Sequence, residues 1–571
     1  MEQRITDAGT CAYATDVWTD DKHQSKVVAC SVVHGFPYWE DVITPKGERH
    51  TKEFMLETCK PGLARKENIG VVSDSPTGMT AFRKAVLEES KGTKVAVGCA
   101  FHWVDKACGD IQGKGPQDAA GFVIPDLVAT ANSSSTMLCK GIVKLMNLRN
   151  VPNGLLKMAR EKENRVRRSE KERLVPSLRM QGETRSTSIA TMYNSVAANR
   201  DVMRTVVSSE NWDEFFDNLQ SDKDAAKNDK LKVRNLVEKI KSRAAMDRIA
   251  DFGKALALTQ IYQRVLEKRQ KTLSDLTLDL FEFCARVEAL PESDAITAEV
   301  KQKMVSAMKY RYDVTGYSPA AALALLLDPR GGFNGRTFNL PQWWCTKYSY
   351  ERDAEQVLEK LVSDQTPELR DKIMAQYNDL LLGRCFDVND PDDVHILDSA
   401  NDMPLWQWYK RKARASCREL FHFVAAKLAH MPITADGCEH GNSLYKWVQA
   451  GRVSLGDDIA RMLVYIIINM RMLKLHKEFD SAECVKGGYR RCWGWPPAER
   501  LEEDARTEVD GEPDPAVAVL HANLVDGIAQ LSADAEAAAA APRTSPRLAR
   551  KRARSELDAA TEIDDEAAAA T

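Results

Sequence analysis

The stretch that decides the fold runs from Ile69 to Ile111 and reads IGVVSDSPTGMTAFRKAVLEESKGTKVAVGCAFHWVDKACGDI. It holds two short apolar runs, Ile69–Val72 and Val95–Val97, and a helical pattern follows each of them. This alternation predicts a strand–helix–strand–helix unit. Open α/β sheets carry their ligand chemistry at the carboxyl ends of the strands. We therefore expect Asp74 and Cys99, which follow the two runs, to lie at such an edge.

The segment before this unit predicts three antiparallel strands. Cys11–Trp18, Lys26–His34 and Pro37–Ile43 are rich in β-forming residues and are separated by short polar turns, which is typical of a meander. Thr51–Ala64 then has helical spacing. The order β-β-β-α-β-α-β-α is that of a ribonuclease-H-like core, in which parallel strands extend an antiparallel meander and helices cover the faces. We predict an α/β core with a mixed sheet.

The 571 residues are enough for two or more structural units. We expect a lead-in over residues 1–10 and the first part of the core over 11–120. A large all-helical insertion follows over 121–404, and C-terminal core helices occupy 405–478, where Trp406–Leu428 is predicted to be one long helix. The acidic, alanine-rich remainder, 479–571, is predicted to be mostly disordered. The chain is thus helix-rich overall.

Composition excludes some broad classes. The formal net charge is -3, so any nucleic-acid surface has to be local. The 13 cysteines are an odd number scattered through a long chain, which favours a reduced, cytosolic or nuclear compartment. The longest apolar run lies around Leu463–Ile468 and is far shorter than the roughly 18 residues that a spanning helix needs. We predict no membrane segment.

Two aspartates stand at the ends of predicted neighbouring strands. Asp16 lies near the end of the first strand and Asp74 follows the fourth. Converging carboxylates hold Mg²⁺ or Mn²⁺, and a pair of such ions supports phosphodiester chemistry. The alternative is that each aspartate merely caps a turn or a helix, and spacing alone leaves both interpretations open.

Three further residues are ambiguous on their own. Cys99 and His102 form a CxxH at a strand-to-helix junction, but a zinc site normally needs four ligands and no second pair has a fitting spacing. A buried thiol beside a histidine at a helix start is the alternative. Glu439 follows Pro432 near a predicted helix start, where a surface or capping carboxylate is the simplest interpretation.

Two segments are basic. Residues 159–179 carry many lysines and arginines, but interleaved glutamates can cancel this charge along a helix. The tail segment 542–554, PRTSPRLARKRAR, is predicted to be a nuclear localisation signal, with a solvated charge run as the alternative. Its core residues are Arg550, Lys551, Arg552 and Arg554.

Together these pieces resemble one family, the hAT (hobo–Activator type) transposases, in the branch with a domain of unknown function over the core and a C-terminal dimerisation region. Seven segments match in family order over roughly residues 12–475. They are ATDVWTD (14–20), VVSDSPTGM (71–79), GCAFHWVDKACGDI (98–111), ETRSTSIATMYNS (183–195), ALALLLDPR (322–330), PITADGCEHGNSLYKWVQAG (432–451) and MLVYIIINMRML (462–473).

The resemblance implies roles for particular residues. Asp16, Asp74 and Glu439 would be the metal-binding carboxylates that, with Mg²⁺ or Mn²⁺, hydrolyse DNA strands at transposon ends and join them to a target. Cys99 and His102 would support the site and the DNA end. The implied partners are DNA and a second copy of the chain bound through the C-terminal region, and the implied location is the nucleus.

The sequence also departs from the family pattern. Ser186 stands where the family has Trp, His440 where it has Arg, and Asn442 where it has an aromatic residue. Only 15 residues precede Asp16, where members carry a zinc-finger module, so the chain resembles a truncated or domesticated copy. The alternative function is therefore a catalytically inactive nuclear DNA- or protein-binding factor that dimerises. A third alternative is an unrelated ribonuclease-H-like nuclease that acts on RNA or hybrids, against which the helical insertion and the closing motif argue.

Overall fold

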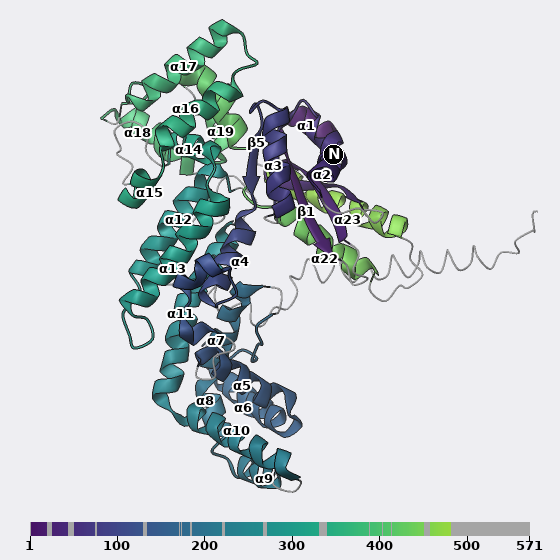
Figure 1. Ribbon diagram of the computed structural model, residues 1–571, viewed down its shortest axis with the longest axis vertical. Helices are drawn as coiled ribbons and strands as arrows, with labels where there is room; N and C mark the ends of the chain where they lie inside the picture. Colours follow the sequence, from purple (N-terminus) through teal and green to yellow (C-terminus); the bar gives the residue numbers. More distant parts are fainter. Residues whose placement is uncertain are drawn as a thin grey trace, which may run out of the picture. The chain divides into compact units, whose positions relative to one another are not determined.

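The protein is described here from a computed structural model (Figure 1). It describes residues 2–480 except 20–24, 44–50, 75–76, 129–133, 171, 173, 183–184, 220–222, 267–270, 331–339, 388, 402, 413 and 450–456. The chain divides into two compact units, Met1–Val509 and Asp510–Thr571. The second unit contains the predicted localisation residues Arg550, Lys551, Arg552 and Arg554, and it lies outside the described residues.

A mixed five-stranded sheet follows a short helix, α1 (Glu2–Ala8). Its strands are β1 (Cys11–Thr19), β2 (Ser25–Val33), β3 (Phe36–Ile43), β4 (Asn68–Ser73) and β5 (Val95–Gly98). The strand order is β3-β2-β1-β4-β5, with the first three strands antiparallel and β4 and β5 parallel to β1. The predicted meander and its parallel extension are confirmed.

Helices cover both faces of the sheet (Figure 1). Because successive strand residues point to opposite faces, Tyr13, Val27 and Val71 pack on one side with α2 (Lys52–Leu63) and α3 (Thr77–Glu89). Ala14 and Val28 belong to the core on the other side. Asp16 has the same parity as Ala14, so it points to this second face.

Helix α22 (Asp436–Gln449) lies across β1, β2 and β3 on the second face. Two glycines one turn apart allow this close approach. A Cβ atom at Gly441 would lie 1.4 Å from the Trp39 ring, and one at Gly437 would lie 2.2 Å from Pro37. The helix that carries Glu439 therefore sits on the sheet because these two positions have no side chain.

Helix α23 (Asp457–Asp480) covers the edge strand β3. The Asn469 side chain accepts a hydrogen bond from Trp39 N at 2.9 Å and donates one to Trp39 O at 2.9 Å. Arg461 pairs with Asp41 of the same strand. The amide thus takes the place of a neighbouring strand and satisfies backbone groups that an open edge would expose.

Helix α4 (Ala100–Ile111) joins the sheet to the insertion. The Asp110 carboxylate, fully buried, accepts two hydrogen bonds of 2.6 Å from Arg311. Trp103 packs edge-to-face against Tyr262 and Tyr312. A bidentate pair and an aromatic cluster therefore fix the insertion on the helix that begins at the end of β5.

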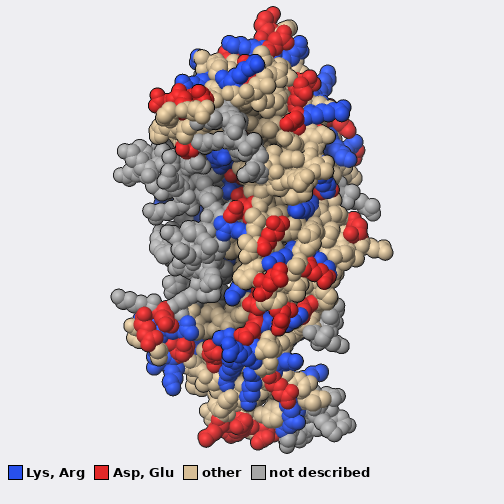
Figure 2. Space-filling view, turned by 90° about the vertical axis from the view of Figure 1, so that its left-hand side faces the viewer, with Lys and Arg blue, Asp and Glu red and all other residues tan. Residues whose placement is uncertain are grey.

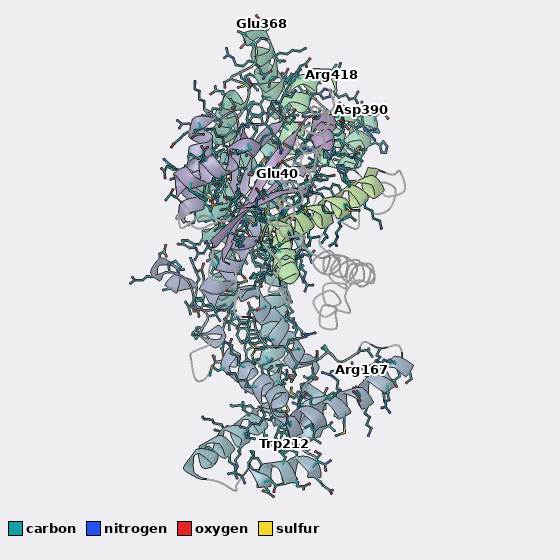
Figure 3. The ribbon with its side chains drawn as sticks, turned by 90° about the vertical axis from the view of Figure 1, so that its right-hand side faces the viewer. Glu40, Arg167, Trp212, Glu368, Asp390 and Arg418 are labelled. Carbon is teal, nitrogen blue, oxygen red and sulfur yellow. The ribbon has the colours of Figure 1, made fainter. Side chains whose placement is uncertain are left out.

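The regular elements of the insertion are helices throughout its described residues, as predicted. They are α5 (Ser135–Leu148), α6 (Asn150–Ser169), α7 (Ile189–Ala198), α8 (Arg200–Val206), α9 (Glu210–Asn218), α10 (Lys223–Lys241), α11 (Arg243–Leu266), α12 (Leu273–Glu288), α13 (Ala298–Arg311), α14 (Pro319–Leu326), α15 (Gln342–Lys347), α16 (Tyr350–Leu361), α17 (Pro367–Leu381) and α18 (Pro391–Asp398), with short 3₁₀ turns between some of them. Figure 3 marks β3 by Glu40, α6 by Arg167 and α9 by Trp212.

The prediction of one long helix over Trp406–Leu428 is wrong. The segment consists of α19 (Leu405–Lys412), α20 (Arg418–Leu420) and α21 (Ala426–Leu428), separated by a 3₁₀ turn and a π-helical turn. Arg414 has extended backbone angles, and its guanidinium bonds to Asp393 of α18. This side-chain contact holds the chain out of the helix, which apolar spacing alone does not predict.

None of the helices in the described part of the chain combines the length and the hydropathy that a bilayer crossing requires.

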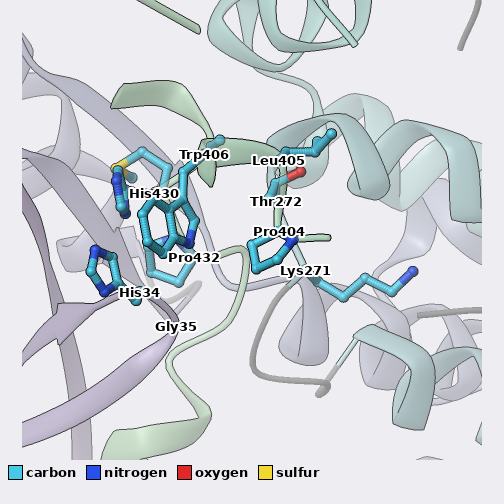
Figure 4. Close-up of a pocket in the computed structure, with 11 residues that line it drawn as sticks. His34, Gly35, Lys271, Thr272, Pro404, Leu405, Trp406, His430 and Pro432 are labelled. Atoms are coloured by element: carbon cyan, nitrogen blue, oxygen red, sulfur yellow. The ribbon is translucent and has the colours of Figure 1, made fainter. Parts of the chain in front are cut away.

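A stack of histidines lies where the β2–β3 turn meets the C-terminal helices (Figure 4). The His34 ring stacks on Trp406 with a centroid distance of 4.0 Å and lies 4.9 Å from the His430 ring. Burial, followed by the charges of His476, Lys410 and Arg4, lowers the pKa of His34 to about 3. Burial, followed by His34 and Lys410, holds the pKa of His430 well below its usual value.

Gly441→Ala should destabilise the protein, because the new methyl group would overlap the Trp39 ring. We expect the free energy of unfolding to fall by about 1–3 kcal/mol. Gly154→Ala, on α6, is the matched control, since nothing lies within 4 Å of its added Cβ. It should change stability by no more than about 1 kcal/mol. Denaturant unfolding monitors both, and equal losses in the two variants would contradict close packing at Gly441.

The histidine stack predicts acid sensitivity. His430 stays neutral when folded, but it takes up a proton in the unfolded chain below about pH 6.5. Its contribution to stability is therefore present above about pH 6.5 and is lost as the pH falls, at about 1.4 kcal/mol per pH unit. His430→Phe should make the pH dependence of unfolding shallower between about pH 6.5 and 4. His395→Phe, at an exposed position, should not, and the same slope in all three proteins would refute the prediction.

Candidate metal centre

The sheet register brings Asp16 and Asp74 side by side. Thr15 of β1 is opposite Ser73 of β4 in the parallel pair, so the next residue on each strand is an aspartate. Both carboxylates are buried, each with 4% of its surface exposed. Parallel neighbours end at the same edge of the sheet, which is where α/β sheets place ligand sites. The predicted pair therefore converges where β4 ends, with Asp16 three residues before the end of β1.

His102 completes a group of three potential ligands. One oxygen each from Asp16 and Asp74 and one ring nitrogen of His102 all lie within 4.8 Å of one another. His102 is on the first turn of α4, which begins directly after β5, and β5 is the parallel neighbour of β4. Within the described part of the chain, this is the group of histidine, cysteine and acidic side chains that could hold a metal ion.

Cys99 has a different position from His102. Its backbone N–H donates to Ser73 O at 2.7 Å, and its thiol accepts a hydrogen bond from Ala435 N at 3.3 Å. The next residue, Ala100, donates from its N–H to Ile433 O at 2.8 Å. Cys99 thus ties the end of β5 both to β4 and to the segment before α22. The structure separates the CxxH pair into a structural cysteine and a histidine that faces the carboxylates.

Helix α22 returns to the site from the far end of the chain. Asn442 Nδ2 donates to Asp16 Oδ2 at 3.1 Å, although the two residues are 426 positions apart. Glu439 is three residues earlier on the same helix, and residues three apart share a face. The Glu439 side chain itself lies outside the described residues, as does that of His440. The structure therefore brings the helix of the third predicted carboxylate to the site, and its side-chain role stays a prediction.

Positive charge surrounds the three ligands. Burial, followed by the charges of Lys106 and Arg185, lowers the pKa of His102 to about 4, so at neutral pH the imidazole is uncharged and able to act as a ligand. Arg83 donates to Ser73 Oγ at 2.8 Å and to the backbone oxygen of Asp74 at 2.5 Å. Burial lowers the pKa of Arg83, an effect that the Asp74 carboxylate opposes. The site thus combines buried acidic oxygens, a neutral nitrogen and nearby cations.

The insertion contributes one wall near His102. Arg185 lies over the Phe101 ring at 4.5 Å, and Thr187 N donates to Asp105 Oδ1 at 3.1 Å. Ser186, where the resembled family has Trp, begins a short 3₁₀ turn whose backbone oxygen accepts a hydrogen bond from Gln112 at 2.9 Å. The segment after position 184 is therefore held on α4 by polar contacts.

A scan against protein-family models finds no match for this chain, and a search of the curated proteins finds none either.

Sequence reasoning missed two features of the site. The resemblance implies that His102 supports the site and the DNA end, and the structure places its ring nitrogen among the carboxylates as a potential ligand. The adjacency of β4 and β5 was the signal, because the residue after β4 and the helix after β5 share one edge. Asn442 was noted only as a departure, although its place three residues after Glu439 put it on the same helix face.

Asn442→Asp tests whether a metal ion balances the negative charge of the buried carboxylates. A further carboxylate beside Asp16 should lower the free energy of unfolding in chelator by about 1–3 kcal/mol, because buried like charges repel. Adding Mn²⁺ should restore more stability to this variant than to the unmodified protein. Thermal unfolding with and without Mn²⁺ measures both effects.

Asn442→Leu is the matched control for this experiment, since it removes the donor to Asp16 without adding charge. It should lose stability to a similar extent but gain no extra response to the metal. If the Asp and Leu variants responded alike to Mn²⁺, a negative charge at position 442 would have no effect on metal binding.

Proposed function

We propose that this chain is a transposase-derived DNA-binding protein of hAT type, with a ribonuclease-H-like core. Its ancestral chemistry is metal-dependent hydrolysis and transfer of DNA strands at Asp16, Asp74 and Glu439. The observation that carries the proposal is the convergence of Asp16 and Asp74 from neighbouring strands. The sheet also supports it, because an antiparallel meander extended by two parallel strands is the arrangement expected of a ribonuclease-H-like core.

The donor set fits a divalent cation of the kind the proposal requires. Two carboxylates and an imidazole offer oxygen and nitrogen ligands within 4.8 Å of one another, and carboxylates are ligands for both Mg²⁺ and Mn²⁺. When bound, such ions activate water and stabilise the leaving oxygen of a phosphodiester. The residues of the chain hold and orient the ion, and burial of the carboxylates restricts bulk water around it.

The phosphate backbone of DNA would meet cations beside the site and on the insertion. Lys106 and Arg185 lie close enough to His102 to lower its pKa. Helix α6 exposes Lys157, Lys162 and Arg165, whereas Arg167 pairs with Glu163. Positive and negative side chains are intermingled over the face in Figure 2, so the DNA contact is local and its affinity should fall with salt.

The C-terminal helix supports self-association. Ile459, Met462, Ile466 and Met470 of α23 are exposed, with Met470 at 67%. Their spacing forms a stripe along one side of the helix, while Asn469 on another side binds β3. We propose that a second copy of the chain covers this stripe, and that the basic run at 542–554 directs the protein to the nucleus.

One observation favours a second candidate, a dimerising nuclear DNA- or protein-binding factor without catalysis. Asp16 Oδ2 already accepts a hydrogen bond from Asn442, at a position where the resembled family has an aromatic residue. An amide that holds this oxygen competes with a metal ion for it. Binding and dimerisation do not depend on the carboxylates and would persist in such a factor.

The test is cleavage of a DNA duplex carrying terminal inverted repeats from the sequence that flanks the gene, with full-length protein and Mn²⁺ or Mg²⁺. Asp74→Asn should reduce cleavage at least about 100-fold, because the metal loses a charged ligand. Asp371→Asn, at an exposed position on α17, is the matched control and should cleave normally.

DNA binding and dimerisation without cleavage by the unmodified protein would favour the second candidate. Cleavage that survives Asp74→Asn unchanged would contradict the proposed site.

A further inference from the structure

We infer that His102 is a direct metal ligand and that the centre takes Mn²⁺ in preference to Mg²⁺. This inference rests on the proposed metal-dependent function and specifies the role of His102 at the site as direct coordination of the ion. It concerns the identity of the ion, which the two carboxylates alone do not determine.

The geometry suits one shared ion. Metal–ligand bonds to oxygen and nitrogen are about 2.0–2.6 Å long, so two ligands on opposite sides of one ion lie about 4–5 Å apart. The atoms of Asp16, Asp74 and His102 fall within 4.8 Å of one another. They come from β1, from the end of β4 and from α4, three elements fixed by the sheet register and by the Cys99 N–H bond to Ser73. Backbone hydrogen bonds therefore fix the positions of the three elements that carry these ligands.

A second observation points to a ligand at the same place. Asn442 is buried, with 8% of its surface exposed, and its Nδ2 is bonded to Asp16 Oδ2. Its other amide atom, Oδ1, is buried and has no hydrogen-bond partner among the described residues. An unpaired buried amide oxygen costs free energy unless something binds it. A cation, or water held by a cation, beside Asp16 supplies that partner.

The nature of the ligands decides which ion is preferred. Mg²⁺ favours oxygen ligands in a near-ideal octahedron and keeps several waters. Mn²⁺ binds carboxylates too, and it stands within the series of first-row divalent ions that nitrogen ligands hold. Zn²⁺ also binds imidazole and carboxylates, so the comparison that this ligand set decides is the one between Mn²⁺ and Mg²⁺. Two carboxylates with one imidazole favour Mn²⁺ over Mg²⁺.

The experiment uses full-length protein and Mn²⁺ alone. Pulsed electron paramagnetic resonance should detect a nitrogen nucleus coupled to bound Mn²⁺, and Mg²⁺ competition should show Mn²⁺ binding at least about tenfold tighter. His102→Ala should lose the nitrogen coupling and most of this preference while keeping Mg²⁺ affinity. His395→Ala, at an exposed position, is the matched control and should retain both. If the Ala variant fails to fold, His102→Gln takes its place, because it keeps a polar side chain of similar size. This variant should also lose the nitrogen coupling.

Two outcomes would overturn the inference and leave the proposed function intact: bound Mn²⁺ without nitrogen coupling in the unmodified protein, or coupling that persists in both His102 variants. In either case Asp74→Asn would still abolish metal binding. If the unmodified protein bound neither Mn²⁺ nor Mg²⁺, the inference and the proposed function would both fail.

Discussion

The structure around the candidate centre depends on one electrostatic constraint, the burial of two carboxylates next to each other. Asp16 and Asp74 are each 4% exposed and come from adjacent strands. In a low-dielectric interior each disfavours ionisation of the other, so the surroundings must compensate. Arg83 reaches the backbone of Asp74, and Asn442 donates to Asp16 from a helix 426 residues away. A divalent cation at the proposed site would add to this compensation.

Helix α4 connects the two buried carboxylates to the helical insertion. Its first turn presents His102 to the carboxylates, its middle holds Thr187 through Asp105, and its last turn binds Arg311 through Asp110. A single helix of 12 residues thus connects the site to two separate segments of the insertion, around Thr187 and around Arg311. Any movement of the insertion that tilted α4 would move His102 relative to Asp74. The pair of the fully buried Asp110 with Arg311 opposes such a tilt, because breaking it would leave the Asp110 charge buried and unpaired.

The antiparallel meander and its parallel extension could be predicted from sequence, because the strands are short apolar runs separated by polar turns or helices, and Asp74 and Cys99 directly follow two of them. The contacts that cross the chain could not be predicted in this way. Asn442 binds Asp16 only because Gly437 and Gly441 let α22 rest on Pro37 and Trp39, and apolar periodicity does not record such a fit. Likewise, the break at Arg414 depends on Asp393 of another helix. Local patterns predict elements, whereas long-range packing decides which polar side chains meet.

The long insertion does not separate the residues of the site, because hydrogen bonds join the segments on either side of the insertion. Ala100 N–H donates to Ile433 O, and Ala435 N–H donates to the Cys99 thiol across 336 residues. These bonds hold the residues before α22 against the end of β5. The chain therefore enters and leaves the intervening helices close to the same end of the sheet. The entropic cost of closing a loop grows only with the logarithm of its length, so a large insertion here costs little more than a short one. Helix α22 can therefore reach Asp16 with little dependence on the length of the insertion, whereas Thr187 and Arg311 of the insertion remain tied to α4.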